Sequence, residues 1–400
     1  MKKRLLSFTL AFIMLFFAGC NIDGKKETKL KTEDLDEATL EGMAEDITDE
    51  MSLKNKIGQL FMVSLYSLDQ ADSKNQTKIT SEMKETLKKY PVGGVVLFSK
   101  NMKTAKQTRQ LISDLQDASY VPLFVAVDEE GGEVSRVASN DKMNVTHYPS
   151  ARKIGETYDD QQIEDMGKNQ SKELKALGFN MNFAPVADVL TNADNIEIGD
   201  RSFGSDAGKV ADIISTLVKS MQKQQISATL KHFPGSGDTN GDTHTGSIKT
   251  EQSIQELRKT DFLPFQAGIK AKTDAIMVSH LMLANVTDEE EPSSLSKRVV
   301  TDILRKELEY DGMIITDAMN MKSITDNYSA GEAAVKAIQA GNDIVVMPEN
   351  LKKAYKAVKI ALRNGTIKES QIDDSVERII YTKLKRGEIP PDTDLLKSNS

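Results

Sequence analysis

The chain has 400 residues, a net charge of −8 and a single cysteine. Its acidic balance, without a clustered basic face, argues against a nucleic-acid partner. One cysteine excludes an internal disulfide bond or a multi-cysteine metal site, so the folded part depends on its apolar core for stability.

The first twenty residues have the three-part layout of a secretory signal. Lys2, Lys3 and Arg4 precede an apolar stretch over residues 5–17, and small residues then lead to Cys20. We expect residues 1–19 to be a signal peptide. The sequence Phe-Ala-Gly-Cys at 17–20 resembles the lipobox of bacterial lipoproteins, which implies that Cys20 carries a lipid. An ordinary secretory signal with an incidental cysteine is the alternative.

The next segment, residues 20–46, is rich in Lys, Glu, Asp and Thr and is expected to be a solvated tether. No other apolar stretch approaches the length of a membrane span. We therefore expect the protein on the extracytoplasmic face of the cell membrane, held there by the lipid anchor alone.

Short apolar runs alternate with helical periodicity through the rest of the chain, and eight runs can be counted. They lie at residues 57–65, 92–98, 122–127, 181–186, 226–230, 275–278, 313–315 and 344–347. Amphipathic segments between them include residues 161–177, 207–224, 254–270 and 299–308. Eight βα units with nearly continuous apolar strands predict an α/β fold, a single (β/α)₈ TIM-type barrel over residues 47–388. An open doubly wound sheet is the main alternative.

Polar residues at the strand ends favour the barrel, because barrel active sites form at the C-terminal ends of the strands. These ends carry Asp128, Asp188, Lys231 with His232, Ser279 with His280, and Asp317. The open sheet is also disfavoured because no Gly-x-Gly-x-x-Gly follows the first run. Residues 370–385 are expected to form a closing helix and residues 389–400 a disordered tail.

The segment 231–244 concentrates residues that can do chemistry. It reads Lys-His-Phe-Pro-Gly-Ser-Gly-Asp-Thr-Asn-Gly-Asp-Thr-His, with Lys231 and His232 where the fifth strand is expected to end. A glycine-rich loop that ends in Asp242 and His244 can place a proton donor over a bound substrate. A polar surface turn is the alternative.

Asp317 directly follows the seventh apolar run. At the barrel mouth its carboxylate could attack the anomeric carbon of a sugar and form a covalent intermediate. Capping the following helix is the alternative role. His244 could then act as acid and base, since its ordinary pKa of about 6.5 is close to working pH, while Asp242 orients the imidazole.

Further side chains are candidates for holding the sugar. Asp128 and Arg136 flank a turn with paired glycines and can grip hydroxyl groups from two sides, or form a surface salt bridge instead. Arg201 follows a long loop and could equally be a solvated arginine. Lys231, His232 and His280 are either ligands or satisfied core residues, and their shared place at strand ends favours ligands.

Together these motifs resemble glycoside hydrolase family 3, most closely its β-N-acetylhexosaminidase branch. Residues 231–244 match the branch's acid/base loop, Asp317 matches its nucleophile, and Asp128 to Arg136, Arg201 to Phe203 and His280 match its sugar-binding positions. The resemblance covers about residues 51–347. The departures include Ser236, where histidine is usual, and Thr243, where serine is usual. Another is Glu129, where glutamine is usual and which adds a charge near the sugar site.

The resemblance implies a retaining exo-β-N-acetylglucosaminidase that acts on non-reducing β-linked N-acetylglucosamine of peptidoglycan fragments. No metal or cofactor is expected, and the protein is expected to be a monomer. Two alternatives remain open from the residues. One is a metal-dependent hydrolase on a barrel, and the other is a sugar-binding lipoprotein without catalytic activity.

Overall fold

The computed structural model describes residues 32–71, 76–239, 241, 244, 246–287 and 290–391. The chain divides into two compact units, Met1–Leu30 and Lys31–Ser400. The described residues all belong to the second unit. The predicted signal peptide and Cys20 lie outside the described residues, as do Asp242 and nearly all of the predicted tail. None of the helices in the described ranges combines the length and the apolar character that a membrane crossing needs.

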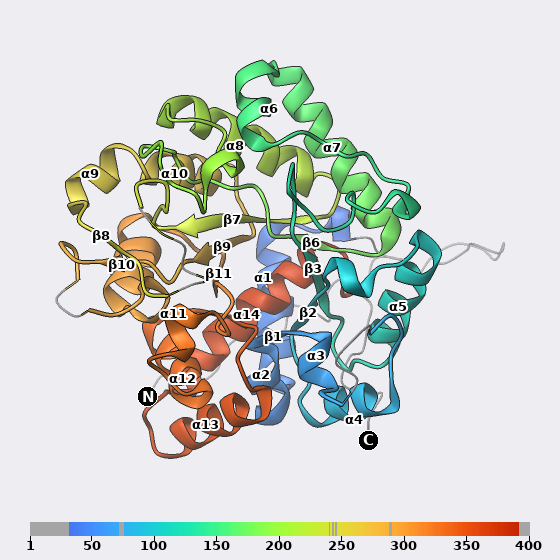
Figure 1. Ribbon diagram of the computed structural model, residues 1–400. Helices are drawn as coiled ribbons and strands as arrows, with labels where there is room; N and C mark the ends of the chain where they lie inside the picture. Colours follow the sequence, from blue (N-terminus) through green and yellow to red (C-terminus); the bar gives the residue numbers. More distant parts are fainter. Residues whose placement is uncertain are drawn as a thin grey trace, which may run out of the picture. The chain divides into compact units, whose positions relative to one another are not determined.

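Eight parallel strands form the centre of the larger unit (Figure 1). They are β1 (Phe61–Ser64), β2 (Gly94–Val96), β3 (Phe124–Val127), β6 (Met181–Asn182), β7 (Ser227–Phe233), β9 (Ala275–Val278), β11 (Met313–Thr316) and β12 (Val345–Val346). Their order is β11-β9-β7-β6-β3-β2-β1-β12, and a parallel bridge between Ile315 and Ile344 joins the two ends. The predicted (β/α)₈ barrel is confirmed, with each strand inside or overlapping its predicted run.

The strands are buried on both sides. Every residue of β3 and β9 is buried, and their sequences, Phe-Val-Ala-Val and Ala-Ile-Met-Val, contain no polar residue. Strands that face side chains inside the barrel and helices outside it must be apolar on both faces. This explains why continuous apolar runs, and not alternating ones, identified the strands.

Helices surround the barrel, and short strands and turns decorate its loops. The α-helices are α1 (Glu37–Glu50), α2 (Leu53–Gln59), α3 (Leu65–Leu68), α4 (Ser81–Lys89), α5 (Ala105–Asp117), α6 (Ala151–Thr157), α7 (Asp160–Leu177), α8 (Ala207–Gln222), α9 (Ile254–Lys259), α10 (Phe262–Lys270), α11 (Lys322–Thr325), α12 (Ala330–Ala340), α13 (Leu351–Arg363) and α14 (Glu369–Lys385). The short strands are β4 (Glu129–Gly131), β5 (Val134–Ser135), β8 (Lys249–Thr250) and β10 (Met282–Leu283). Five 3₁₀ turns, at Thr32–Asp34, Ser99–Asn101, Asp141–Met143, Gly199–Arg201 and Ser293–Leu295, and a π-helix at Arg298–Glu307 complete the described elements.

One predicted helix is two helices. Residues 254–270 were expected to be continuous, but α9 ends at Lys259 and α10 begins at Phe262. Pro264 explains the break, because it has no N–H to donate to the carbonyl four residues earlier and its ring crowds that carbonyl. Proline is tolerated in the first turn of α10, where an N–H would have no helical partner.

The folded part begins earlier than the sequence indicated. Helix α1 starts at Glu37, so it overlaps the last ten residues of the predicted tether, and that part of the tether prediction is wrong. Leu40 and Ala44 are buried, and α1 packs along α14 (Figure 1). The closing helix α14 is confirmed, and Ile389, the first residue of the predicted tail, is buried too.

Candidate active site

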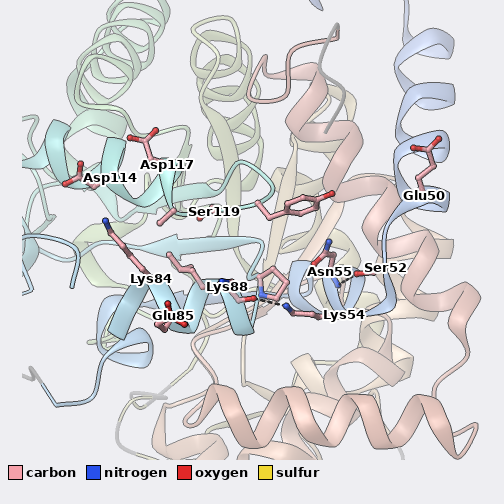
Figure 2. Close-up of a pocket in the computed structure, with 14 residues that line it drawn as sticks. Glu50, Ser52, Lys54, Asn55, Lys84, Glu85, Lys88, Asp114, Asp117 and Ser119 are labelled. Atoms are coloured by element: carbon pink, nitrogen blue, oxygen red, sulfur yellow. Dashed lines mark hydrogen bonds between the residues drawn. The ribbon is translucent and has the colours of Figure 1, made fainter. Parts of the chain in front are cut away.

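The predicted site residues that the structure describes gather at the C-terminal ends of the strands. A separate hollow lies at the other end of the barrel (Figure 2) and is lined by Lys54 of α2, Lys84 of α4, Asp117 of α5 and neighbouring residues. Its lining residues come just before β1, β2 and β3 in the chain, so they lie where these strands start. Barrel enzymes place their chemistry at the opposite face, which here holds the clustered charges described below.

Lys231 is the centre of a buried charge network. Its Nζ lies 2.7 Å from Oδ1 of Asp128 and 2.6 Å from Oε1 of Glu130, and its side chain is only 3% exposed. Strand β7 runs to Phe233, so Lys231 and His232 lie inside the strand and not at its end as expected. The two carboxylates explain how a lysine can be buried there, since a buried charge must be paired.

Glu130 joins Lys231 to Arg201. The guanidinium donates from Nε to Oε2 and from Nη2 to Oε1, both at 2.9 Å, a paired geometry that arginine forms with carboxylates. Burial disfavours the Glu130 carboxylate, but the charges of Lys231 and Arg201 outweigh burial and lower its pKa to about 2. Sequence reasoning did not assign Glu130 to the site, although it stands two residues after Asp128.

His232 contacts the same network from the other side. Its Nδ1 lies 2.7 Å from Oδ2 of Asp188, and its Nε2 lies 3.3 Å from Nη2 of Arg201. Asp188 was recognised as a residue at a strand end but was given no role in the site. The structure therefore brings Asp128, Lys231, His232 and Arg201 together, and their contact with a sugar stays a prediction.

The turn after β3 forms the hairpin β4–β5, which carries Arg136. The Glu129 carboxylate accepts hydrogen bonds from the N–H groups of Val137 at 2.7 Å and Ala138 at 3.3 Å. Burial is the main reason that its pKa is raised to about 7. Glu129 is therefore buried against the hairpin backbone, and the extra charge expected near the sugar site stays a prediction.

Arg136 has an unsatisfied hydrogen-bond donor. Its Nε is buried and, among the described residues, has no hydrogen-bond partner. The expected alternative of a salt bridge to Asp128 is not what the structure shows, because the Asp128 carboxylate bonds Lys231 instead. Contact between Arg136 and a sugar stays a prediction.

Asp317 lies one residue beyond β11, with its side chain partly exposed at the barrel mouth. It does not cap a helix, since α11 begins at Lys322 with Met321 at its N-cap. Its Oδ1 accepts from the N–H of Ala318 at 2.6 Å. Burial opposes ionisation, but the electrostatic influence of the His280 and His232 rings, this N–H and the Lys231 ammonium together outweigh burial and lower the pKa of Asp317.

His280 supports the Asp317 segment. Its Nε2 lies 3.1 Å from the Ala318 carbonyl, which can only accept, so Nε2 carries the proton and Nδ1 accepts from the Ser294 hydroxyl at 2.8 Å. Burial lowers the pKa of His280, which favours the neutral ring. Because His280 is fully buried, its predicted contact with a sugar stays a prediction.

His244 ends the segment 231–244, the predicted acid/base loop, and most of its side chain is exposed. Its Nδ1 lies 3.7 Å from Oε1 of Glu197, on the loop that leads to Arg201. The predicted partner Asp242 lies outside the described residues. In the described ranges, no three His, Cys, Asp or Glu side chains are grouped as ligands for a metal ion.

Comparison with known proteins decides the family. The family described as "Glycosyl hydrolase family 3 N terminal domain" matches residues 52–382. The chain belongs to glycosyl hydrolase family 3. This match confirms the predicted family and extends beyond the expected end of the resemblance at Met347.

Several relatives in family 3 are named beta-hexosaminidases. Beta-hexosaminidase LpqI of Mycobacterium tuberculosis is 33% identical over 341 residues, which are 83% of each chain. Beta-hexosaminidase A of Pseudoalteromonas piscicida is 32% identical over 77% of this chain, but the chain spans only 56% of that relative's length. A solved family 3 beta-N-acetylglucosaminidase from Paenibacillus superposes with a TM-score of 0.79 at 34% identity, covering 84% of this chain and 63% of the other.

Proposed function

We propose that this family 3 hydrolase is a retaining exo-β-N-acetylglucosaminidase that removes non-reducing β-linked N-acetylglucosamine from peptidoglycan fragments. The observation that carries the proposal is Asp317, whose carboxylate is partly exposed at the barrel mouth and has a lowered pKa. An ionised carboxylate in this place can act as a nucleophile. The names of the relatives, beta-hexosaminidase and beta-N-acetylglucosaminidase, support the choice of sugar.

The reaction would take two steps. Asp317 attacks the anomeric carbon and forms a glycosyl-aspartate while His244 protonates the departing oxygen. His244 then takes a proton from water, which attacks the anomeric carbon and releases Asp317. Asp242 orients His244, and the sugar is held by Asp128, Arg136, Arg201, Lys231, His232 and His280.

The deciding experiment compares wild type with Asp317→Ala and His244→Ala on two substrates. One is an activated chromogenic β-N-acetylglucosaminide, and the other is the disaccharide of two β-linked N-acetylglucosamines. We expect Asp317→Ala to lose on the order of 10⁴-fold in kcat on both. His244→Ala should lose about 10²- to 10⁴-fold, with the greater loss of kcat/KM on the disaccharide, whose poor leaving group needs the acid.

Matched controls come from exposed residues of the same kind. Asp311, at the opposite end of β11, and His147, on a surface loop, are both exposed. Their alanine variants should keep wild-type turnover. Undiminished turnover in Asp317→Ala would refute the covalent mechanism, and activity that is lost with EDTA and restored by zinc would favour the metal-dependent alternative. A fluorinated N-acetylglucosaminide should label the peptide that contains Asp317.

We further propose that Cys20 anchors the enzyme to the outer face of the cell membrane. The basic residues Lys2 to Arg4, the apolar stretch at 5–17 and the small residues before Cys20 support this placement. Cells given radiolabelled palmitate should label the wild-type chain and not Cys20→Ser. Equal label in the two chains would contradict the anchor.

A further inference from the structure

Asp188 is a fully buried carboxylate with three N–H donors around it. Oδ2 accepts from the backbone N–H of His232 at 3.1 Å and lies 2.7 Å from its Nδ1. Oδ1 accepts from the backbone N–H of Ser236 at 2.7 Å. A buried carboxylate is stable only if its oxygens are satisfied in this way. One side chain therefore joins the sugar-site histidine to the beginning of the acid/base loop.

The partners of the His232 ring determine which nitrogen carries the proton. A guanidinium can only donate, so Nη2 of Arg201, 3.3 Å away, requires a lone pair on Nε2 of His232. The proton must then be on Nδ1, where the Asp188 carboxylate accepts it. The two neighbours select one neutral tautomer, because a proton on Nε2 would face the N–H of Arg201.

We propose that Asp188 is a positioning residue that fixes His232 in the Nδ1-protonated tautomer and, through its other oxygen, holds the start of the acid/base loop. This inference rests on the proposed function, because it treats His232 as part of the sugar site. With Nε2 unprotonated, His232 presents an acceptor to Arg201 or to a hydroxyl group of the sugar. The opposite tautomer could only donate there.

The start of the loop is held by backbone contacts. The Ser236 carbonyl accepts from Nδ2 of Asn195 at 2.7 Å and from the Thr239 hydroxyl at 3.0 Å. A Cβ on Gly237 would approach the Val189 carbonyl to 1.8 Å, so this loop lies directly against the segment that follows Asp188. Asp188 accepts a hydrogen bond from the backbone N–H of residue 236 and does not bond its side chain. Serine in place of the usual histidine therefore leaves this hydrogen bond intact.

The variant Asp188→Asn tests the proposal with almost no change of shape. The amide has one acceptor oxygen where the carboxylate has two, so the Nδ1–H of His232 and the N–H of Ser236 can no longer both be satisfied. A fraction of His232 should therefore move its proton to Nε2. Nitrogen-15 NMR of the histidine-labelled full chain at neutral pH distinguishes the two tautomers. The chain has four histidines, and the spectrum of His232→Gln identifies the signal of His232. We expect an Nδ1–H ring in wild type and a mixture of the Nδ1–H and Nε2–H rings in Asp188→Asn.

Binding should follow the tautomer. Free N-acetylglucosamine should inhibit Asp188→Asn about tenfold more weakly than wild type, since one hydrogen bond of the site is replaced by a donor–donor contact. Asp188→Glu, which keeps the carboxylate, should keep the wild-type tautomer. Asp261→Asn is the matched control, because Asp261 is buried beside Gly235 under the same loop and no contact joins it to His232 in the described part of the chain.

The spectrum of the wild type alone can overturn the proposal. An Nε2–H ring or a doubly protonated ring at His232 would refute it, whether or not Asp188→Asn folds. An equal change of tautomer in Asp261→Asn would also refute it, because the cause would then be general disturbance of the loop. The spectra require no turnover, so failure of this inference is separate from failure of the proposed activity.

Discussion

Glu129 and Glu130 are neighbours in the chain with opposite electrostatic environments. Successive side chains of an extended segment point to opposite sides. Glu130 meets Lys231 and Arg201, which keep it ionised, with a pKa of about 2. Glu129 points into the hairpin, where burial raises its pKa to about 7. The motif Asp-Glu-Glu therefore combines a residue of the site with a residue of the scaffold.

Glu129→Gln should stabilise the protein more at high pH than at low pH. Because the pKa of Glu129 in the folded state is above its unfolded value of about 4.3, the folded state binds more protons between these values and wild-type stability falls as pH rises from about 4 to 7. Glutamine removes this loss. The free energy of unfolding of the variant, relative to wild type, should rise by about 1–3 kcal/mol between pH 5 and pH 8.

Urea unfolding at the two pH values measures this difference. The control is Glu133→Gln, since Glu133 is exposed on the same hairpin. In Glu129→Gln the N–H of Ala138 loses its acceptor at both pH values. This loss lowers the free energy of unfolding by the same amount at each pH, so the change of stability with pH is unaffected. A relative stability that does not change with pH would show that Glu129 titrates normally.

At the scale of elements, the strands were predictable and some of their ends were not. Apolar runs located all eight barrel strands because both faces are buried. The prediction ended the fifth strand at Leu230, whereas β7 continues to Phe233. Lys231 looked like the start of a loop because its charge partners, Asp128 and Glu130, are about one hundred residues earlier in the chain. Pairing over such a distance is not visible in local sequence.

The site shows the same limit. The strand-end rule and the family resemblance identified Asp128, Lys231, His232 and Asp317, and the structure places the first three in one network. Glu130 and Asp188 were missed as site residues because acidic residues are common in this chain, which has 60 Asp and Glu. Only the geometry shows that these two are buried and paired with cations or N–H donors.

At the scale of the molecule, the two ends of the barrel differ in structure and in role. The C-terminal end carries the charged site, and the N-terminal end is closed by α14 and its contacts. Arg386 pairs with the buried Asp274, just before β9, and Lys56 of α2 pairs with Asp373 of α14 at 2.7 Å. These contacts stabilise the barrel at the end away from the charged site, in keeping with the division between the two faces of this fold.

Lys383 of α14 is the most unusual residue of this closed end. Its side chain is fully buried, and Nζ donates to Oε1 of Gln59 at 2.7 Å and to the Gly93 carbonyl at 3.0 Å. The Phe124 ring lies 5.0 Å from Nζ. No carboxylate is bonded to it in the described residues, and burial lowers the pKa of Lys383 to about 7. The amine therefore changes charge near neutral pH inside the fold.

Lys383 should make the protein more stable as pH rises above neutrality. Below about pH 7 the amine is charged in both states, and the cost of its burial is fully present. Between about pH 7 and the unfolded value of about 10.4, the unfolded state binds more protons, so stability increases with pH. Lys383→Met removes this increase. Between pH 7 and pH 9.5 the free energy of unfolding of the wild type should rise by about 3 kcal/mol more than that of the variant.

Denaturant unfolding of both proteins across this range tests the prediction, and other titrating groups cancel in the difference. Lys368→Met is the control, since Lys368 is exposed at the start of the same helix and should give a flat difference. The hydrogen bonds to Gln59 and Gly93 are lost in Lys383→Met at every pH. Their loss lowers the free energy of unfolding by a constant amount and does not change its dependence on pH. A flat difference for Lys383→Met would mean that the barrel end keeps the ammonium charged, with water or the Phe124 ring compensating its burial.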